Sequence, residues 1–296
     1  MLDWYAVHAR PLPWRMTTDP WAVLVSEVML QQTPVARVVP VYTEWLARWP
    51  APADLAASPA GDAVRAWGRL GYPRRAVRLH AAAGVITTSY AGAVPSALSA
   101  LLTLPGVGDY TARAVASFAF GQRHPVVDTN VRRVVARAVD GVERAGPPRA
   151  VADLAAVARF VPESPAAAAT FGVALMELGA LVCTARSPSC SVCPLAAGCA
   201  WLLAGRPAYG GPVVRKPQWQ GSDRQARGAL LAQLRGAAGS VGASELAAAW
   251  PDRAQRLRAL ESLVTDGLAE AVGGGGYGLA GYEQVCPSGS RPSALL

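Results

Sequence analysis

Four cysteines within one short segment constrain this chain more than any other feature. Cys183, Cys190, Cys193 and Cys199 are spaced C-x6-C-x2-C-x5-C, directly after the helical sequence LMELGALVC. Four thiolates suit zinc as well as an iron–sulfur cluster, but zinc usually takes two CxxC arms and this segment has one. Two structural disulfides are a further alternative. Because no signal peptide precedes the first residues, we expect a reducing compartment and a bound metal cofactor.

Positive charge is concentrated in the first three quarters of the chain. The net charge of the 296 residues is +8; residues 1–221 carry 21 basic and 13 acidic side chains, and residues 222–296 carry seven of each. A basic region of this kind fits a polyanionic partner held through phosphate contacts. The arginine-rich usage also has a second explanation in a GC-rich genome. No apolar run reaches membrane-spanning length, so we expect no membrane partner.

Helical patterns dominate the first 205 residues. Asp19 followed by Pro20 is an N-cap with proline in the first turn, and it predicts a helix over 21–32. Pro34 begins a second helix that extends to Trp49. Further helices are predicted over residues 61–69, 74–88, 97–102, 109–120, 128–139, 149–160 and 165–181. We therefore expect an all-α region.

The C-terminal quarter has a different pattern. A stretch rich in glycine and proline, residues 206–221, predicts a linker. Beyond it, the sequences SDRQARGALLAQLR, ASELAAAW and DRAQRLRALESLVTDG predict three helices. LAEAV and YGLAG, joined by the glycines of 273–276, predict a β-hairpin. Residues 222–296 are thus expected to form a small winged-helix-like module with a flexible tail, in which Cys286 is an unliganded thiol.

A glycine-rich turn in LPGVGDYTARAVASFAFG, residues 104–121, is the second strong motif. Gly106 and Gly108 permit a tight turn between two helices and leave backbone N–H groups free near Asp109. Such a helix N-terminus attracts phosphate. An ordinary αα-hairpin is the commoner use of this kind of turn.

Two carboxylates are candidates for chemistry. Glu27 lies in LVSEVMLQQTP, where it is either an exposed position on an amphipathic helix, the alternative that the sequence by itself favours, or a carboxylate held against apolar walls. In the second case burial raises its pKa and makes it a proton donor. Asp128, in HPVVDTNVRR, is placed to cap the next helix. Breaking an N-glycosidic bond needs both an acid and an anion that stabilises an oxocarbenium ion.

These motifs together resemble a known family. The cysteine spacing, with Pro194 in SVCPLAAGC, resembles the 4Fe-4S cluster loop of the endonuclease III superfamily of DNA glycosylases, and LPGVG resembles its helix-hairpin-helix. SEVMLQQT is similar to the catalytic segment of adenine DNA glycosylases of the MutY type. The resemblance covers about residues 3–205 and includes LPWR and GRLGYPRRA. It implies a mainly α fold, with a six-helix domain over about 20–125 and a cluster domain over about 1–19 plus 126–205.

The resemblance also implies roles for individual residues. Glu27 is expected to protonate the leaving adenine and then to activate water, while Asp128 and Tyr110 stabilise the oxocarbenium ion. Asn130 is a polar partner of the site, in DTN where the family more often has DGN. Residues implied to contact DNA, the flipped adenine or an opposing 8-oxoguanine are Trp14, Arg15, Gln32, Thr33, Leu70, Gly71, Tyr72, Gly106 and Gly108. The alternative is that Trp14 and Tyr72 are core aromatics and that Arg15 is a surface cation.

The resemblance implies removal of adenine opposite 8-oxoguanine or guanine in double-stranded DNA, by a monomer in the cytoplasm associated with the nucleoid. An endonuclease III-like glycosylase/lyase for oxidised pyrimidines and a non-catalytic, redox-sensing iron–sulfur protein are the alternatives. A lyase needs a reactive amine, whereas Lys216 is the one lysine of the sequence and Tyr110 occupies the hairpin position of the lyase lysine. Many members of the family have a Nudix-like C-terminal domain, and residues 222–296 are too few to form one. They resemble the tails of actinobacterial members, and we expect a packing or protein-contact module there.

Overall fold

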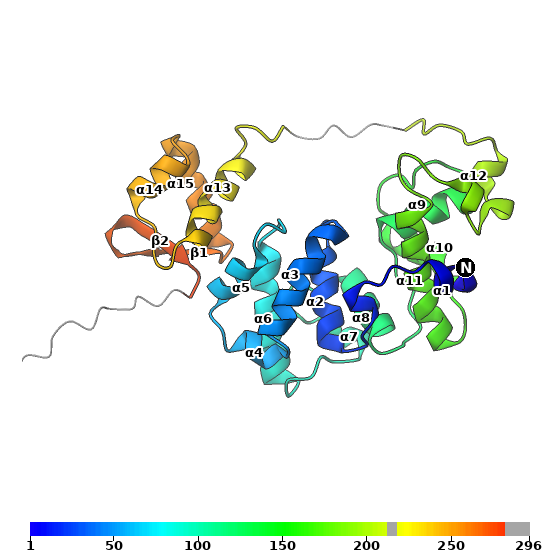
Figure 1. Cartoon of the computed structure of the whole chain (residues 1–296), viewed down its shortest axis with the longest axis horizontal. Helices are drawn as coiled ribbons and strands as arrows, with labels where there is room; N and C mark the ends of the chain where they lie inside the picture. The colour runs from blue at the N-terminus through cyan, green and yellow to red at the C-terminus, as the bar shows by residue number, and fades with distance from the viewer. Residues whose placement is uncertain (212–217, 282–296) are drawn as a thin grey trace, which may run out of the picture. The chain divides into compact units, whose positions relative to one another are not determined.

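The computed structural model describes residues 1–211 and 218–281, which are mainly helical (Figure 1). These residues form two compact units. Unit 1 consists of Met1–Ala53 and the described part of Ala82–Arg215; unit 2 consists of Asp54–Ala81 and the described part of Lys216–Leu296. Lys216 and Cys286 lie outside the described residues. Within those residues, no helix is both long and apolar enough to span a bilayer.

The described residues of unit 1 form helices and no strands. Its elements are α1 (Leu2–His8), η1 (Pro13–Arg15), α2 (Pro20–Leu30), α3 (Val35–Arg48), α7 (Leu98–Leu101), α8 (Asp109–Phe118), α9 (Thr129–Ala138), α10 (Ala150–Ala158), α11 (Pro165–Leu181), η2 (Cys190–Val192), η3 (Ala196–Gly198) and α12 (Ala200–Leu203). Helix α4 (Pro52–Ala56) and helix α6 (Arg74–Ser89) contribute residues to both units.

Helix α2 is buried along almost its whole length. The Asp19 carboxylate accepts hydrogen bonds from the backbone N–H groups of Trp21 and Ala22, both at 3.2 Å, and Pro20 occupies the first turn. All residues from Trp21 to Met29 are buried, because α2 packs against both α3 and α8. A carboxylate placed on this helix is therefore removed from water on every side.

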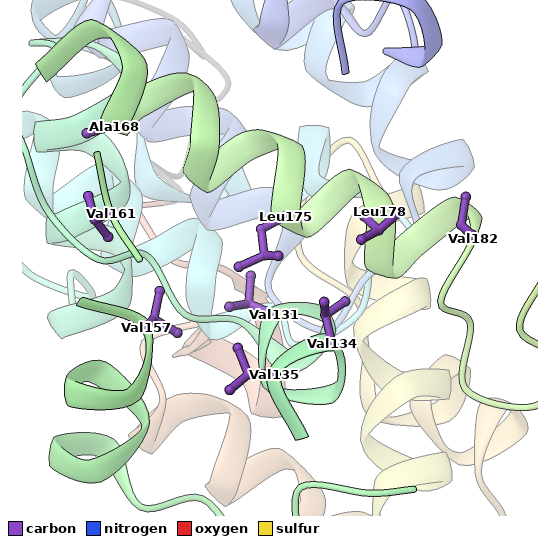
Figure 2. Close-up of a cluster of buried hydrophobic side chains, with 9 residues drawn as sticks. All are labelled: Val131, Val134, Val135, Val157, Val161, Ala168, Leu175, Leu178 and Val182. Carbon is purple, nitrogen blue, oxygen red and sulfur yellow. The ribbon is translucent and has the colours of Figure 1, made fainter. Parts of the chain in front are cut away.

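Helices α9 and α11 form the other core of unit 1. Val131, Val134 and Val135 of α9 meet Leu175 and Leu178 of α11 (Figure 2). The approach of the two helices is close at Gly179, where a Cβ atom would lie 2.6 Å from the Cβ of Asn130. The start of α9 is thus fixed by packing, and Asp128 lies directly before it.

Unit 2 joins a short segment of the middle of the chain to its C-terminal part. Its elements are α5 (Ala60–Trp67), the beginning of α6, α13 (Asp223–Gly236), α14 (Ala243–Ala249), α15 (Arg253–Thr265), β1 (Ala269–Val272), η4 (Gly273–Gly275) and β2 (Gly276–Leu279). Strands β1 and β2 are antiparallel, with Ala269 opposite Leu279, and Val241 adds an isolated bridge to Tyr277. Helix α13 packs on α15.

The predicted mainly α fold and the three helices and hairpin after residue 221 are confirmed. Helices α1, α4 and α12 were not predicted. Helix α1 buries none of its residues, and α4 and α12 have five and four residues, so none of them has the long apolar period by which a helix is recognised. The domain boundaries inferred from the sequence, including the cluster domain, remain a prediction.

Candidate active site

Glu27 is a buried carboxylate, and the exposed alternative is wrong. Glu27 is 1% exposed, and neither of its carboxylate oxygens has a hydrogen-bond partner within 3.5 Å among the described residues. Burial is the main cause that raises its pKa above the ordinary value. The positive charge of Arg15 and the nearby Tyr110 hydroxyl oppose this shift, and the Asp128 charge adds to it. A carboxyl group in this environment is predisposed to hold a proton.

Tyr110 lies in the first turn of α8 and faces the same site. Its pKa is raised well above the ordinary value, first by burial and then by the charges of Glu27 and Asp128. The phenol therefore stays protonated at neutral pH and can donate a hydrogen bond. Tyr110 comes two residues after Gly108, directly behind the glycine turn.

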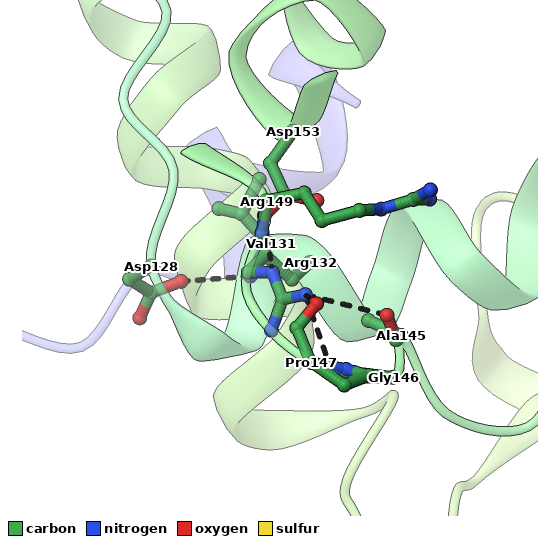
Figure 3. Close-up of polar contacts among 8 residues, drawn as sticks. All are labelled: Asp128, Val131, Arg132, Ala145, Gly146, Pro147, Arg149 and Asp153. Atoms are coloured by element: carbon green, nitrogen blue, oxygen red, sulfur yellow. Dashed lines mark hydrogen bonds and ion pairs between the residues drawn. The ribbon is translucent and has the colours of Figure 1, made fainter. Parts of the chain in front are cut away.

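Asp128 caps α9 and belongs to the same group. Its Oδ1 accepts a hydrogen bond from the Val131 N–H at 2.7 Å (Figure 3), and its Oδ2 accepts one from the Asn130 side-chain amide at 2.7 Å. Burial raises the pKa of Asp128, and these two hydrogen bonds oppose the shift. The cap predicted from the sequence is confirmed, and the charge of the Asp128 carboxylate raises the pKa of both Glu27 and Tyr110.

The beginning of α9 is held from a second side by Arg132. Its Nε donates to the Asp153 carboxylate at 2.8 Å, and its Nη2 donates to the carbonyl oxygens of Ala145, Gly146 and Pro147 (Figure 3). The ion pair is largely shielded from water, because the two side chains are 13% and 19% exposed. This network fixes the helix that Asp128 caps.

Trp14 and Arg15 lie in η1, close to the site. Trp14 is buried and contacts Tyr42 edge to face, with ring centroids 5.4 Å apart, so its alternative as a core aromatic is supported. Arg15 stacks over the ring of Phe118 at 5.3 Å, and its buried Nε has no hydrogen-bond partner in the described residues. Arg15 is therefore not a surface cation: its charge acts on Glu27.

The N-terminal segment is fastened by a contact that the sequence does not reveal. Arg10 donates from Nε and Nη2 to the two oxygens of Glu177 at 2.5 and 2.8 Å, and Glu177 is 4% exposed. A bidentate arginine–carboxylate pair of this kind fixes orientation as well as distance. It places η1, and with it Arg15, against the body of unit 1. The two residues are 167 positions apart, so no local pattern connects them.

Two of the predicted DNA contacts share an unusual backbone conformation. Gln32, at the end of α2, and Tyr72, between α5 and α6, have φ angles of +55° and +47°. Such angles are uncommon for residues other than glycine and often mark functional positions. Gln32 is exposed and Tyr72 is 56% exposed, so Tyr72 is not a core aromatic. Thr33 is buried next to Gln32, and its hydroxyl donates to the carbonyl oxygen of Gln31.

The loop that carries Tyr72 belongs to unit 2. Leu70 is buried, at 3% exposure, whereas Gly71 has a φ of +84° and presents its carbonyl oxygen to Trp67 and Arg75. Leu70 therefore serves as an anchor beneath the loop. Unit 1 thus gathers the groups proposed for chemistry and the residues Trp14, Arg15, Gln32 and Thr33, while Leu70, Gly71 and Tyr72 lie in unit 2.

The glycine turn has the geometry predicted for it. Gly106 has a φ of +79°, and Gly108 is the N-cap of the ten-residue helix α8. Both glycines are exposed. Asp109 pairs with Arg113 on the first turn of α8, at 2.9 Å. The turn therefore presents backbone N–H groups at the surface, as binding of a phosphate requires.

The four cysteines are half-buried free thiols, and among the described residues no three His, Cys, Asp or Glu side chains are arranged closely enough to hold a metal ion. The thiol of Cys193 has a raised pKa, mainly through burial, and lies close enough to the other three to be affected by their charges. Arg137, which is 2% exposed, donates to the sulfur of Cys183 at 3.4 Å and to the carbonyl oxygens of Thr184 and Ala185. Four thiolates with a buried guanidinium beside them fit an iron–sulfur cluster, because the cation offsets their negative charge.

Arg133 connects the cysteine loop to the acidic site. It donates to the Cys183 carbonyl oxygen at 2.7 Å, to the Gly179 carbonyl oxygen at 2.6 Å and to the side-chain oxygen of Asn130 at 2.8 Å. Asn130 in turn donates to Asp128. The conformation of the cysteine loop and the position of the Asp128 carboxylate therefore both depend on Arg133.

Comparison with known proteins identifies the class first. Residues 25–155 match the HhH-GPD superfamily of base excision DNA repair proteins, and residues 183–199 match the iron–sulfur binding domain of endonuclease III. A solved structure of a thermostable thymine-DNA glycosylase is 29% identical, with a TM-score of 0.63, and the match covers 69% of this chain and 93% of that one. The fold and the cysteine loop thus define a helix-hairpin-helix base excision repair protein with a 4Fe-4S cluster.

The chain belongs to the adenine DNA glycosylase family. An adenine DNA glycosylase of Mycobacterium tuberculosis (strain CDC 1551 / Oshkosh) is 53% identical over 95% of this chain and 92% of its own length. That of Mycolicibacterium smegmatis (strain ATCC 700084 / mc(2)155) is 52% identical over 95% of both chains. These two matches each cover 95% of this chain, whereas the thymine-DNA glycosylase match covers 69%.

Proposed function

We propose that this protein is a monofunctional adenine DNA glycosylase that removes adenine opposite 8-oxoguanine or guanine in double-stranded DNA. The observation that supports this most directly is the buried Glu27 carboxyl beside the Tyr110 hydroxyl and the charge of Asp128. Removal of a base by hydrolysis needs a proton donor for the leaving group and a negative charge for the sugar cation, and these groups supply both. We further propose that the protein acts as a monomer.

The proposed reaction uses Glu27 twice. The protonated carboxyl donates its proton to the Hoogsteen-edge nitrogen of a flipped adenine, and the N-glycosidic bond breaks with its electron pair staying on the base. The Asp128 carboxylate then stabilises the oxocarbenium ion, with the Tyr110 hydroxyl as a further polar contact. The Glu27 carboxylate accepts a proton from the attacking water, and the resulting hydroxide bonds to the sugar carbon. Glu27 ends the reaction protonated, as it began.

The remaining positions support recognition of the mispair. Flipping a base leaves a gap in the duplex that a glycosylase must fill. Gln32 is proposed to fill this gap and Tyr72 to insert beside the opposing base, because both are exposed on strained backbone. We assign the opposing base to Thr33, Leu70, Gly71 and Tyr72, the adenine to Trp14 and Arg15, and a backbone phosphate to Gly106 and Gly108. The cluster ligands are Cys183, Cys190, Cys193 and Cys199.

A panel of labelled duplexes tests the proposed function. Under single-turnover conditions we expect release of adenine from A:8-oxoguanine and A:G duplexes and no release of thymine glycol. If thymine glycol is released and the adenine of the A:8-oxoguanine duplex is not, the protein is an endonuclease III-like enzyme instead. Binding of all duplexes without excision of any base would identify a non-catalytic DNA-binding protein.

Trapping with borohydride separates the hydrolytic route from the lyase route. An imine with DNA needs a reactive amine, and the hairpin position holds Tyr110 rather than lysine. We expect almost no covalent adduct on an A:8-oxoguanine duplex during complete excision, measured by gel shift under denaturing conditions. The Lys216→Ala variant, which lacks the one lysine of the sequence, is the control. Efficient trapping that persists in this variant and with a blocked N-terminal amine contradicts the hydrolytic route.

A further inference from the structure

The loop that carries Tyr72 is held rigidly by the two helices that flank it. Trp67, the fully buried last residue of α5, donates from its indole N–H to the Gly71 carbonyl oxygen at 3.0 Å. Arg75, in the first turn of α6, donates to the same oxygen at 2.9 Å and stacks on the rings of Trp67 and Tyr72, at 5.0 and 5.6 Å. The position of Tyr72 therefore follows from the positions of α5 and the start of α6.

Helix α5 is packed against the C-terminal module at its N-terminal end. The Gly61 N–H donates to the Ala280 carbonyl oxygen at 2.6 Å. A Cβ atom at Gly61 would lie 2.7 Å from that oxygen and 2.8 Å from the Leu279 Cβ, so only glycine permits this approach. The end of strand β2 thus lies directly on the first turn of α5.

Two arginines exchange hydrogen bonds between α5 and α13. Arg65 of α5 donates from Nε to the Arg235 carbonyl oxygen at 3.2 Å and from Nη2 to the Ala237 carbonyl oxygen at 3.0 Å. Arg235 returns a hydrogen bond from its Nε to the Val64 carbonyl oxygen at 2.9 Å. Burial of Arg235 lowers its pKa to about 10. The Arg65 guanidinium satisfies carbonyl groups that the end of α13 leaves without a helical partner.

The start of α6 is held by the same module. Arg74 pairs with Asp266 at 3.3 Å, and Asp266 is fixed by Arg227 of α13 at 2.6 Å. At the next turn of α6, the Val77 side chain lies 3.6 Å from the position of a Cβ on Gly267. Both helices that determine the Tyr72 loop are therefore attached to residues 218–281.

We propose that the C-terminal module, residues 218–281, is a positioning element for the Tyr72 loop and thereby determines how strongly the protein prefers 8-oxoguanine to guanine opposite adenine. The inference rests on the proposed function, since Tyr72 is assigned there to the opposing base. Residues 218–281 carry six basic and six acidic side chains, so the module adds no net positive charge for DNA. It acts through packing and hydrogen bonds on the α5 and α6 helices, and its residues make no contact with the base.

The experiment removes the side-chain hydrogen bonds between α5 and the C-terminal module by substitution and keeps the full-length chain. In the double variant Arg65→Gln/Arg235→Met, both guanidinium groups that link α5 and α13 by hydrogen bonds are removed. We expect the ratio of single-turnover excision rates, A:8-oxoguanine over A:G, to fall about tenfold, with A:G excision changed by less than about threefold. The matched control is Arg253→Gln/Arg258→Met, which makes the same changes of residue and charge at exposed positions of α15. This control should keep the wild-type ratio.

A Tyr72→Ala background distinguishes positioning from general damage. If the module acts through Tyr72, the double variant has no further effect on the ratio once Tyr72 is alanine. An equal fall of the ratio in both backgrounds, or a wild-type ratio in the folded double variant, overturns the proposal. If the double variant does not fold, as judged by thermal unfolding, Arg74→Gln is used instead, with an expected fall of about threefold; a wild-type ratio there also overturns it.

Amide hydrogen exchange gives a readout that does not depend on excision. The amides of residues 68–76 should exchange at least about tenfold faster in the double variant than in the control, while those of α9 are unchanged. If the wild-type protein excises no adenine, the proposed function fails, and this measurement still decides whether the module holds the loop. Unchanged exchange of residues 68–76 in the double variant contradicts the positioning role even if the excision ratio falls.

Discussion

The Glu27→Gln variant is expected to lose adenine excision while it keeps its affinity for duplex DNA. Glutamine preserves the size of the buried side chain but has no proton to donate, and general acid catalysis is worth about 100-fold to 10,000-fold. Single-turnover excision and duplex binding, measured in parallel, check this. Near-normal cleavage by the variant would mean that another group is the acid. Glu44→Gln, the same change in the exposed part of α3, is the matched control and should leave the rate unaltered.

The pH dependence of excision follows from the same carboxyl group. Burial raises the pKa of Glu27, so the protonated, active form persists to higher pH than in an ordinary glutamate, and the rate should fall as pH rises through that pKa. Asp128 must be ionised, and its pKa is also raised, so the rate should fall again at acidic pH. A bell-shaped profile of the single-turnover rate is expected. The residual activity of Glu27→Gln should lack the alkaline limb, and an identical limb in that variant contradicts the assignment.

The Asp128→Asn variant is expected to lose excision without loss of stability. Asparagine caps a helix about as well as aspartate, so the hydrogen bond from Val131 can be kept. The negative charge beside the developing cation is removed, and electrostatic groups of this kind are worth about 100-fold to 1,000-fold in rate. Single-turnover rates and thermal unfolding, measured together, separate the two effects.

A second helix cap provides the control for this variant. Asp252 caps α15 by accepting a hydrogen bond from the Gln255 N–H at 2.8 Å. Asp252→Asn makes the same chemical change in unit 2 and should leave excision unchanged. If Asp128→Asn loses much of its stability, and excision falls only in proportion to the unfolded fraction, then Asp128 acts as a helix cap and not as a catalytic group.

Much of the fold could be predicted because its signals are local. The helix starts at Asp19 and Asp128 follow from cap residues, and the glycine turn and the cysteine spacing are each contained within about 20 residues of sequence. The C-terminal hairpin follows from two short apolar segments separated by glycines. Each of these patterns depends only on neighbouring residues, and backbone geometry turns it directly into structure.

The burial of Glu27 was missed although the sequence carries a signal for it. The residues of α2 are apolar on all sides of the helix, which is typical of a buried helix, but a glutamate is rarely buried, and only the packing of α3 and α8 against α2 decides between the two. The Arg10–Glu177 pair and the Arg65–Arg235 contact were missed for the same reason. Their partners are 167 and 170 positions apart, and an arginine in an arginine-rich sequence gives no indication of its partner.

Unit 2 consists of two segments that are far apart in the sequence, so its parts are synthesised at different times. Residues 54–81 leave the ribosome before the roughly 130 residues of Ala82–Arg215 and only then meet the segment that completes their unit. At about 5–20 residues per second this interval is roughly 6 to 26 s. During that time Val64 and Trp67, both fully buried in the finished protein, lack the C-terminal part of their surroundings. The nascent chain therefore exposes the apolar surface of Val64 and Trp67 until its last quarter emerges.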